Sequence, residues 1–166
     1  MTSRTGKPII ISTGMASIAE LDEAVRAARE AGCTQLALLK CTSTYPASPE
    51  NSNVATIPHM RALFGCQVGL SDHTMGVGVS VAAVAQGATL IEKHFTLSRA
   101  DGGVDSAFSL EPAELVDGVH GRAAHMRAMA QPTIAAGLAN HDRVVIAIAD
   151  RPDRGPTGRR HAANFT

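Results

Sequence analysis

The chain has almost no aromatic side chains. Only 3% of its 166 residues are aromatic, and tryptophan is absent. The core must therefore be built from aliphatic residues, which suits a parallel sheet covered by helices. The formal net charge is zero, so no excess of positive charge favours nucleic acid or an anionic membrane as a partner. We expect neither of these partners.

Long apolar runs and paired cysteines are also lacking. No segment approaches the ~20 apolar residues of a membrane-spanning helix, and the N-terminal MTSRTGKPIII has no long apolar core of a signal peptide. The three cysteines, Cys33, Cys41 and Cys66, are far apart, and their spacing fits neither a disulfide framework nor a zinc site. These features predict a cytoplasmic protein.

Four short aliphatic runs stand out in the first two thirds of the chain. They are KPIIIST (7–13), TQLALLKC (34–41), CQVGLS (66–71) and ATLIEKH (88–94). Each run is continuous rather than alternating with polar residues, which is typical of strands buried on both faces. The sequence therefore predicts four buried β-strands.

Helical patterns lie between these runs. Ser17 and Glu20 have the spacing of a capping box, and Gly32 is a helix stop signal, so a helix is predicted between them. The apolar face of this helix is expected to hold Leu21, Val25 and Ala28. Further helices are predicted over residues 53–64, over residues 77–86, and from Pro112 onward.

The alternation of strands and helices predicts an α/β fold with right-handed βαβ units and a parallel sheet. The repeat of roughly 22 to 30 residues fits either a doubly wound sheet or part of a (β/α)8 barrel. No strand is followed by GxGxxG or GxxxxGK[ST], so nothing indicates a nucleotide-binding version of either fold.

Polar residues gather where the predicted strands end, which is the edge where parallel α/β folds carry out chemistry. His73 and His94 end two consecutive strands. Since adjacent strands lie ~4.8 Å apart, both imidazoles can reach one divalent ion at ~2.1 Å. Without a carboxylate ligand, such a site suits Mn²⁺ or Mg²⁺ completed by substrate oxygens. The alternative is that His73 caps a turn and His94 is a hydrogen-bonded core histidine.

Four motifs, read in order, resemble the catalytic barrel of the sialic acid synthase family. They are STGMAS, LLKCTSTYPASPE, GLSDHTMG and LIEKHFTLSRADGGVDSAFSLEP, which fall within residues 7–116. Within this family, KCTSTYPA and SRADGGVDSAFSLEP are similar to the pseudaminic acid synthase versions of these segments. The resemblance implies a (β/α)8 TIM-barrel type of fold, of which this chain holds the second half, strands five to eight.

The resemblance also implies an activity. Family members condense phosphoenolpyruvate with an open-chain N-acetylated amino sugar, release phosphate, and form a nine-carbon 2-keto acid sugar. The pseudaminic-type segments imply a diacetamido-trideoxy hexose as the sugar. Two alternatives stay open: an N-acetylneuraminate synthase, which differs only in its sugar, and a truncated remnant without catalysis.

The motifs carry site residues over from the family. The resemblance implies that His73 and His94 are catalytic and ligate the divalent metal, Mn²⁺ or Mg²⁺. Ser12 and Ser71 match serines that bind phosphoenolpyruvate. The SDHT motif (71–74) is expected to fix His73 rather than to contact substrate. The positions that match the sugar pocket are Ser43, Tyr45 and Asp105, with Lys40 as a contributor to sugar specificity.

The resemblance covers only part of the family's architecture. Residues 1–117 are expected to form the C-terminal half of the barrel. Residues 118–166 are expected to be a divergent tail, frameshifted or disordered, or alternatively a helix followed by the strand-like RVVIAIAD (143–150). The early strands, whose lysine and glutamate contact the substrate and the metal-site water, have no counterpart. Neither has the antifreeze-like domain that lends an arginine across the family's homodimer. We therefore expect the isolated chain to be inactive.

Overall fold

The computed structural model describes residues 6–118 and 145–150. All four predicted strands are present, and the predicted helices lie between them. The elements are β1 (Ile9–Ser12), α1 (Ile18–Glu30), β2 (Leu36–Cys41), η2 (Pro49–Asn51), α2 (Thr56–Phe64), β3 (Gln67–Asp72), α3 (Gly78–Ala85), β4 (Leu90–Phe95), η3 (Arg99–Asp101), η4 (Ser106–Phe108) and β5 (Val145–Asp150). A further helical segment begins at residue 112, as predicted.

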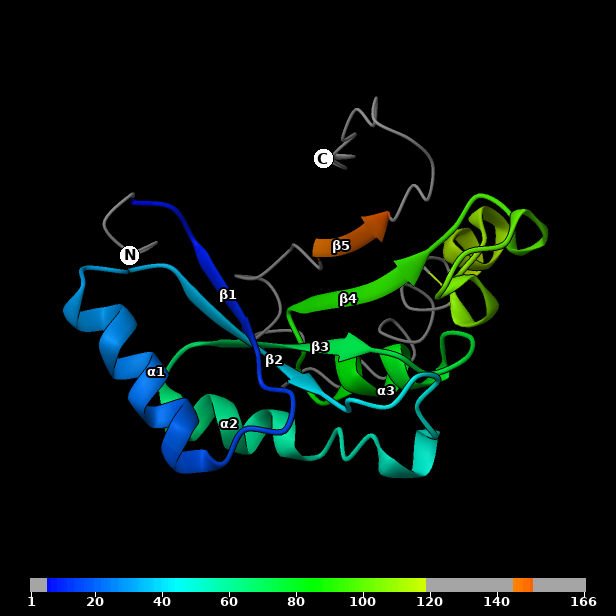
Figure 1. Cartoon of the computed structure of the whole chain (residues 1–166). Helices are drawn as coiled ribbons and strands as arrows, with labels where there is room; N and C mark the ends of the chain where they lie inside the picture. The colour runs from blue at the N-terminus through cyan, green and yellow to red at the C-terminus, as the bar shows by residue number, and fades with distance from the viewer. Residues whose placement is uncertain (1–5, 119–144, 151–166) are drawn as a thin grey trace.

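The five strands form one parallel sheet in the order β1-β2-β3-β4-β5. Helices α1, α2 and α3 lie along the same face of this sheet (Figure 1). A doubly wound sheet reverses its strand order and carries helices on both faces, whereas a barrel keeps sequential order with helices outside. The fold is therefore α/β of the TIM-barrel type, in the form of a half-barrel, as the resemblance implied.

Helix α1 confirms the predicted capping box. The Ser17 backbone N–H donates to Glu20 Oε2 at 2.7 Å, and the Glu20 backbone N–H donates to Ser17 Oγ at 3.3 Å. These bonds satisfy two of the N–H groups that the start of a helix leaves without an intrahelical partner. The residues buried on its inner face are the predicted Leu21, Val25 and Ala28. Gly32 has a φ of +89°, a left-handed conformation that ends the helix.

Two arginines join each helix to the end of the next one. Arg29 of α1 donates from Nη2 to the Phe64 carbonyl oxygen at 2.6 Å, at the C-terminus of α2. The Arg61 guanidinium of α2 donates in the same way to the Gly87 carbonyl oxygen, just after α3. These carbonyls have no partner within their own helices, so the arginines cap them and fix the spacing between neighbouring helices.

The core lies between the sheet and its helices, in two clusters of buried aliphatic residues. The other face of the sheet is partly open at β1, where Ile10 is 50% exposed. On the same inner face, Gly69 of β3 has no side chain, and this leaves space for Leu39 of β2 and Leu90 of β4. A Cβ at Gly69 would lie 2.1 Å from the Leu90 carbonyl oxygen and 2.8 Å from Leu39 Cδ2. Side chains of β2 and β4 thus close over β3, as they do inside a barrel.

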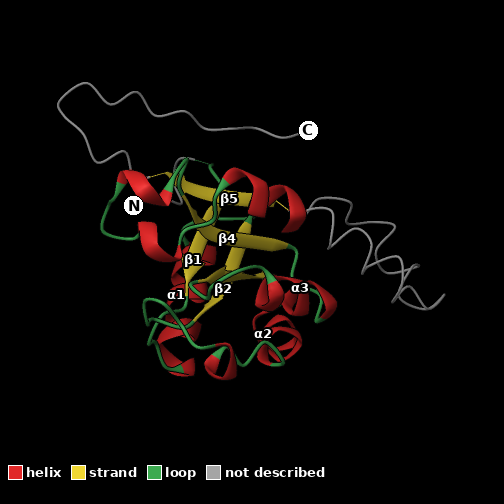
Figure 2. Ribbon diagram, turned by 90° about the vertical axis from the view of Figure 1, so that its right-hand side faces the viewer, coloured by secondary structure: helices red, strands yellow, loops and turns green. Residues whose placement is uncertain are grey.

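Strand β5 pairs with β4 in parallel, with His94 in register with Ala149. This strand coincides with the strand-like segment that was one alternative for the tail. Residues 119–144 and 151–166 lie outside the described residues, so the frameshifted or disordered tail and its boundary at 117 stay predictions. Figure 2, a view turned by 90°, shows β5 beside β4. Within the described residues, no helix is long and apolar enough to span a membrane.

Candidate functional site

The two histidines meet on the inner face of the sheet, at its carboxyl edge. Ser71 of β3 is in register with Glu92 of β4, and the Ser71 hydroxyl donates to Glu92 Oε1 at 2.8 Å. Two residues further along each strand, His73 and His94 therefore point to this same face. Their ring centroids are 5.3 Å apart, with 59° between the ring planes. The two rings therefore lie side by side, whereas their binding of one shared metal ion stays a prediction.

The surroundings of His73 determine its tautomer. His73 Nδ1 lies 3.0 Å from the Thr42 carbonyl oxygen. Because a carbonyl oxygen can only accept, the ring carries a hydrogen on Nδ1. Nε2 lies 3.5 Å from Ser71 Oγ, whose hydrogen is already donated to Glu92. In the tautomer that carries this hydrogen, the lone pair lies on Nε2, which is the arrangement usual for a metal-binding histidine.

His94 is held by the loop that follows β4. Its Nδ1 lies 3.6 Å from Asp105 Oδ2, and its ring packs edge-on against Phe108, with centroids 5.0 Å apart. Burial lowers the pKa of His94, although the Asp105 carboxylate acts in the opposite direction. The neutral ring is thereby favoured at neutral pH, and a metal ligand must be neutral.

Tyr45 covers the two histidines from the loop after β2. Its ring centroid lies 4.3 Å from that of His73, 6.1 Å from that of His94 and 5.9 Å from that of Phe108. Tyr45 is still 56% exposed. A half-open aromatic wall of this kind can pack against one side of a bound sugar while its hydroxyl stays in contact with water.

The turn after β3 is built on a buried carboxylate. Asp72 Oδ1 accepts hydrogen bonds from the Thr74 backbone N–H at 2.9 Å and the Thr74 hydroxyl at 2.7 Å. Asp72 Oδ2 accepts from the Ser80 hydroxyl at 2.5 Å and lies 3.1 Å from Lys93 Nζ. Asp72 points away from the inner face, so it fixes the backbone that carries His73 instead of touching the ring.

Lys93 joins this turn to β4. Its ammonium donates to the Thr74 carbonyl oxygen at 2.6 Å in addition to pairing with Asp72. Lys93 is only 5% exposed. Burial lowers the pKa of Lys93, and the Asp72 carboxylate partly offsets this. The residue before His94 is thus bonded to the residues on either side of His73.

Other predicted site residues lie further from the histidines. Ser12 ends β1, two strands away from β3, and its position in register with Leu39 places it on the inner face. Ser43 Oγ lies 3.7 Å from Cys41 Sγ, in the loop after β2. Lys40 is in register with Leu70, on the helix side of the sheet, and its Nζ donates to Thr42 Oγ1 at 2.7 Å. The structure therefore does not bring Lys40 to the inner face.

Two residues beside the histidines were not singled out as substrate-site residues from the sequence. Glu92 faces inward beside Ser71, and the Phe108 ring lies against His94. The rarity of aromatic residues in this chain was a usable signal for Phe108, because it is one of only four phenylalanines and lies in a polar loop. Strand alternation was a usable signal for Glu92, since it lies two residues before His94.

The donor set at this edge fits a weakly held divalent ion. Among residues 6–118 and 145–150, no group of three or more His, Cys, Asp and Glu side chains is arranged to hold a metal. The two imidazoles can supply two ligands, and the remaining positions of an octahedral ion are then left to water or substrate oxygens. The predicted Mn²⁺ or Mg²⁺ site would therefore be incomplete and open, and it stays a prediction.

A cavity lies at the opposite end of the strands. Its volume is about 650 Å³, and its lining includes Pro8, Arg29, Cys33, Gln35 and Gln67. These residues surround the amino ends of the strands, where conservation of fold rather than chemistry is usual in parallel barrels. The aromatic and histidine cluster at the carboxyl edge is therefore the better candidate for the functional site.

Comparison with known sequences decides the family. The NeuB family profile matches residues 1–133. The chain belongs to the NeuB family. This agrees with the resemblance to sialic acid synthases, and the similar proteins include a legionaminic acid synthase, a pseudaminic acid synthase and an N-acetylneuraminate-9-phosphate synthase.

Three similar proteins illustrate the range of products that their names give. An N,N'-diacetyllegionaminic acid synthase from Campylobacter jejuni is 44% identical over 115 residues, which cover 68% of this chain and 34% of that protein. A pseudaminic acid synthase from Helicobacter pylori is 41% identical over 109 residues, which cover 66% of this chain and 32% of that protein. The crystal structure of an N-acetylneuraminic acid synthetase from Leptospira borgpetersenii in complex with citrate matches with a TM-score of 0.73 and 28% identity, over 85% of this chain and 51% of that one. The chain spans about a third of the length of these two curated relatives.

Proposed function

We propose that this chain forms the carboxyl-edge part of a synthase site that joins phosphoenolpyruvate to an open-chain N-acetylated amino sugar. The products are phosphate and a nine-carbon 2-keto acid sugar. The observation that carries the proposal is the pair of histidines on adjacent strands, with ring centroids 5.3 Å apart and Tyr45 packed over them. Membership of the NeuB family supports the class of reaction.

In this proposal, the two histidines hold Mn²⁺ or Mg²⁺ through one ring nitrogen each. A divalent ion in this position supplies a Lewis acid that polarises the aldehyde oxygen of the sugar. The chain's own groups keep the rings ready for this role. The Thr42 carbonyl fixes the hydrogen of His73 on Nδ1, and the burial of His94 favours its neutral form.

Each of the other predicted residues is assigned to one of the two substrates. Ser71 and Ser12 are assigned to phosphoenolpyruvate, because both lie on the inner face at strand ends. Tyr45, Ser43 and Asp105 are assigned to the sugar, and Tyr45 and Asp105 lie beside the histidine rings. Lys40 keeps only an indirect role in this assignment, through its bond to Thr42.

We propose a diacetamido-trideoxy hexose as the sugar. The support is the loop segment SRADGGVDSAFSLEP, whose Asp105 and Phe108 both contact His94. N-acetylmannosamine is the second candidate, because the solved Leptospira structure that the chain resembles is named an N-acetylneuraminic acid synthetase. The two sugars differ in the groups that would face this loop, so the loop is where selection between them is expected.

Metal binding tests the site directly. Mn²⁺ is titrated into the purified chain and free ion is followed by electron paramagnetic resonance. We expect weak binding that is lost in His73→Ala and in His94→Ala, since each change removes one of two protein ligands. His59→Ala is the matched control, because His59 is exposed on α2, which covers the face of the sheet opposite to the two histidine rings (Figure 1). Binding that survives both site changes contradicts the assignment.

Phosphate release tests the reaction. The chain is incubated with phosphoenolpyruvate, Mn²⁺ and either the diacetamido sugar or N-acetylmannosamine, beside a His73→Ala control. The expectation from the sequence is that the isolated chain is inactive, because losing several groups that stabilise developing charge costs ~10²–10³ in rate for each. Release that needs both a sugar and His73 would show that expectation wrong and would identify the preferred sugar.

A further inference from the structure

The loop between β4 and the helical segment at 112 is closed at its base. The Thr96 backbone N–H donates to the Leu110 carbonyl oxygen at 2.9 Å, and the Leu110 N–H donates to the His94 carbonyl oxygen at 2.9 Å. The chain therefore leaves the sheet and returns to it at the same place, as in an Ω-loop. The part between these ends carries Asp105 and Phe108, the two residues that contact the His94 ring.

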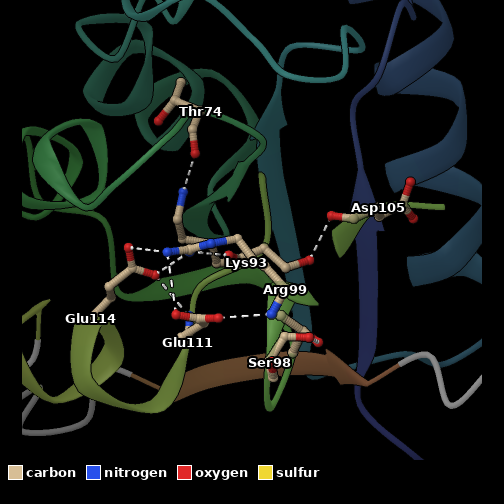
Figure 3. A network of polar contacts seen from close by, with 9 residues as sticks. Thr74, Lys93, Ser98, Arg99, Asp105, Glu111 and Glu114 are labelled. Carbon is tan, nitrogen blue, oxygen red and sulfur yellow. Dashed lines mark hydrogen bonds and ion pairs between the residues drawn. The ribbon is translucent and has the colours of Figure 1, made fainter. Parts of the chain in front are cut away.

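One side chain spans the base of this loop. Arg99 donates from Nη1 and Nη2 to the two carboxylate oxygens of Glu114, at 2.6 and 3.0 Å. Its backbone N–H donates to Glu111 Oε1 at 2.7 Å, and its Nη2 lies 3.3 Å from Glu111 Oε2. Figure 3 shows the Arg99 side chain directed toward both glutamates. The entry of the loop is thus bonded to its exit by a two-pronged pair, which fixes direction as well as distance.

Arg99 is also connected to the tip of the loop. Its Nη1 donates to the Ser109 carbonyl oxygen at 3.0 Å, and the Ser109 hydroxyl donates to the Asp105 carbonyl oxygen at 2.8 Å. The Asp105 carboxylate then faces His94 Nδ1 at 3.6 Å. Ser109 is buried, so these bonds are shielded from water on one side. A continuous path of contacts leads from Glu114 to the His94 ring.

We propose that Arg99 is a positioning residue that holds the loop 97–109 in the one conformation in which Asp105 and Phe108 meet His94. Arg99 does not touch the histidines. It acts by joining Glu111, Glu114 and Ser109 around the base of the loop. The consequence for sugar selection rests on the proposed function, whereas the position of the loop does not. We call these contacts of Arg99 the clamp. With the clamp intact, the loop lines the sugar side of the site and determines which sugar fits.

Nuclear magnetic resonance of the full chain tests the position of the loop. In the wild type, ring protons of His94 and Phe108 should show a mutual nuclear Overhauser effect. In Arg99→Met this effect should be lost, and exchange protection of the amides of residues 99 and 111 should fall at least ~10-fold. The Tyr45–His73 contact should remain in the same spectrum, because Arg99 does not reach it.

Three further variants distinguish loss of the Arg99–Glu114 pair from the effect of removing any surface charge. Glu114→Gln removes the charge and one paired oxygen without touching Arg99, so it should reproduce the loss. Arg99→Lys keeps the charge but cannot form the two-pronged pair, and it should restore little of the contact. Arg26→Met is the matched control, because Arg26 pairs with Asp22 in an exposed contact on α1. An unchanged His94–Phe108 effect in folded Arg99→Met and Glu114→Gln would overturn the proposal.

Mn²⁺ supplies a second readout, because a paramagnetic ion broadens nearby resonances. If the histidines bind Mn²⁺, the signals of Phe108 and Tyr45 should both broaden in the wild type, whereas in Arg99→Met the broadening of Phe108 should be reduced and that of Tyr45 should not change. Absence of broadening in the wild type would count against the metal site of the proposed function. The nuclear Overhauser and exchange measurements would still decide the role of Arg99. Equal broadening of Phe108 in the wild type and Arg99→Met would overturn it.

Discussion

The turn after β3 and the loop after β4 each present one histidine to the same edge of the sheet, yet different interactions hold them. The turn depends on the Asp72–Lys93 pair, in which both side chains are at most 5% exposed. The loop depends on Arg99 and Glu114, whose side chains are 34% and 40% exposed. One histidine therefore rests on a buried ion pair and the other on a pair at the surface.

This difference affects the stability of the fold and determines which part of the site can change. A buried pair that loses one partner leaves an uncompensated charge in the core, so the turn cannot change without cost to the whole fold. An exposed pair contributes little to global stability because water and salt screen it. The turn is thus fixed as part of the core, while the contacts of Arg99 with Glu114 can be broken, and the loop released, without unfolding the sheet.

The largest effect is expected from Lys93→Met. The substitution leaves the Asp72 carboxylate buried without its cation, so the free energy of unfolding should fall by about 3–5 kcal/mol. Urea denaturation followed by circular dichroism measures this change. The double variant Lys93→Met, Asp72→Asn should recover much of the loss, because Asn keeps an acceptor for the Thr74 backbone N–H and carries no charge.

Arg26→Met provides the scale for this measurement. The exposed Arg26–Asp22 pair on α1 should cost about 0.5 kcal/mol or less when it is removed. A Lys93→Met variant as mild as this control would mean that the buried pair does not hold the turn. The proposed difference between the turn and the loop would then be wrong.

A smaller loss is expected from Ser80→Ala, in the same buried network. Ser80 Oγ donates to Asp72 Oδ2 at 2.5 Å, and a hydrogen bond to a charged group contributes about 1.5–3 kcal/mol. Lys93 still contacts the same oxygen after the change, so a loss near the lower end, about 1.5 kcal/mol, is expected. Ser106→Ala is the matched change in the loop, where the hydroxyl donates to the Gly103 carbonyl oxygen in an exposed contact. Equal losses at the two serines would contradict the comparison.

The parts of the fold that depend on local sequence were predictable. Continuous aliphatic runs gave the four strands, and the Ser17–Glu20 capping box gave the start of α1. The start of α2 was predicted at residue 53, three residues before the structure begins it at Thr56. Asn53 has a φ of +45°, which a helix does not allow, and this placement lets Pro58 fall in the first turn.

The site was predictable to the extent that strand geometry dictates it. His73 and His94 end neighbouring strands, and a parallel register then brings them together. Lys40 was assigned to sugar specificity from its motif alone, and the alternation of side chains along the strand argues against direct contact. Leu38, two residues earlier on β2, packs against the helices, so Lys40 points to that side as well. The contacts of Arg99 were not predictable, because they depend on the path of a loop and not on a repeating pattern.

The smallest effect on the whole molecule is expected from acid, which should act on the loop. The hydrogen bonds from Arg99 and from the Glu111 backbone N–H lower the pKa of Glu114 from its ordinary value of 4.5. A lowered pKa means that the folded loop binds the proton less readily than the unfolded chain does. The contribution of the clamp is therefore complete above pH 4.5 and is lost as the pH falls through the lower pKa of the folded state.

Amide exchange, expressed as protection relative to the unfolded chain at each pH, measures this loss. Protection of residues 99 and 111 should fall several-fold as the pH decreases below 4.5, while that of Val68 in the core of β3 should change less. Glu114→Gln supplies the reference, because its loop has no Glu114 carboxylate left to protonate. Wild type and variant should differ at pH 6 and converge in acid, since a protonated Glu114 and a glutamine are both uncharged partners for Arg99. A difference that persists unchanged down to the lowest pH at which the chain stays folded would show that the charge of Glu114 does not hold the loop.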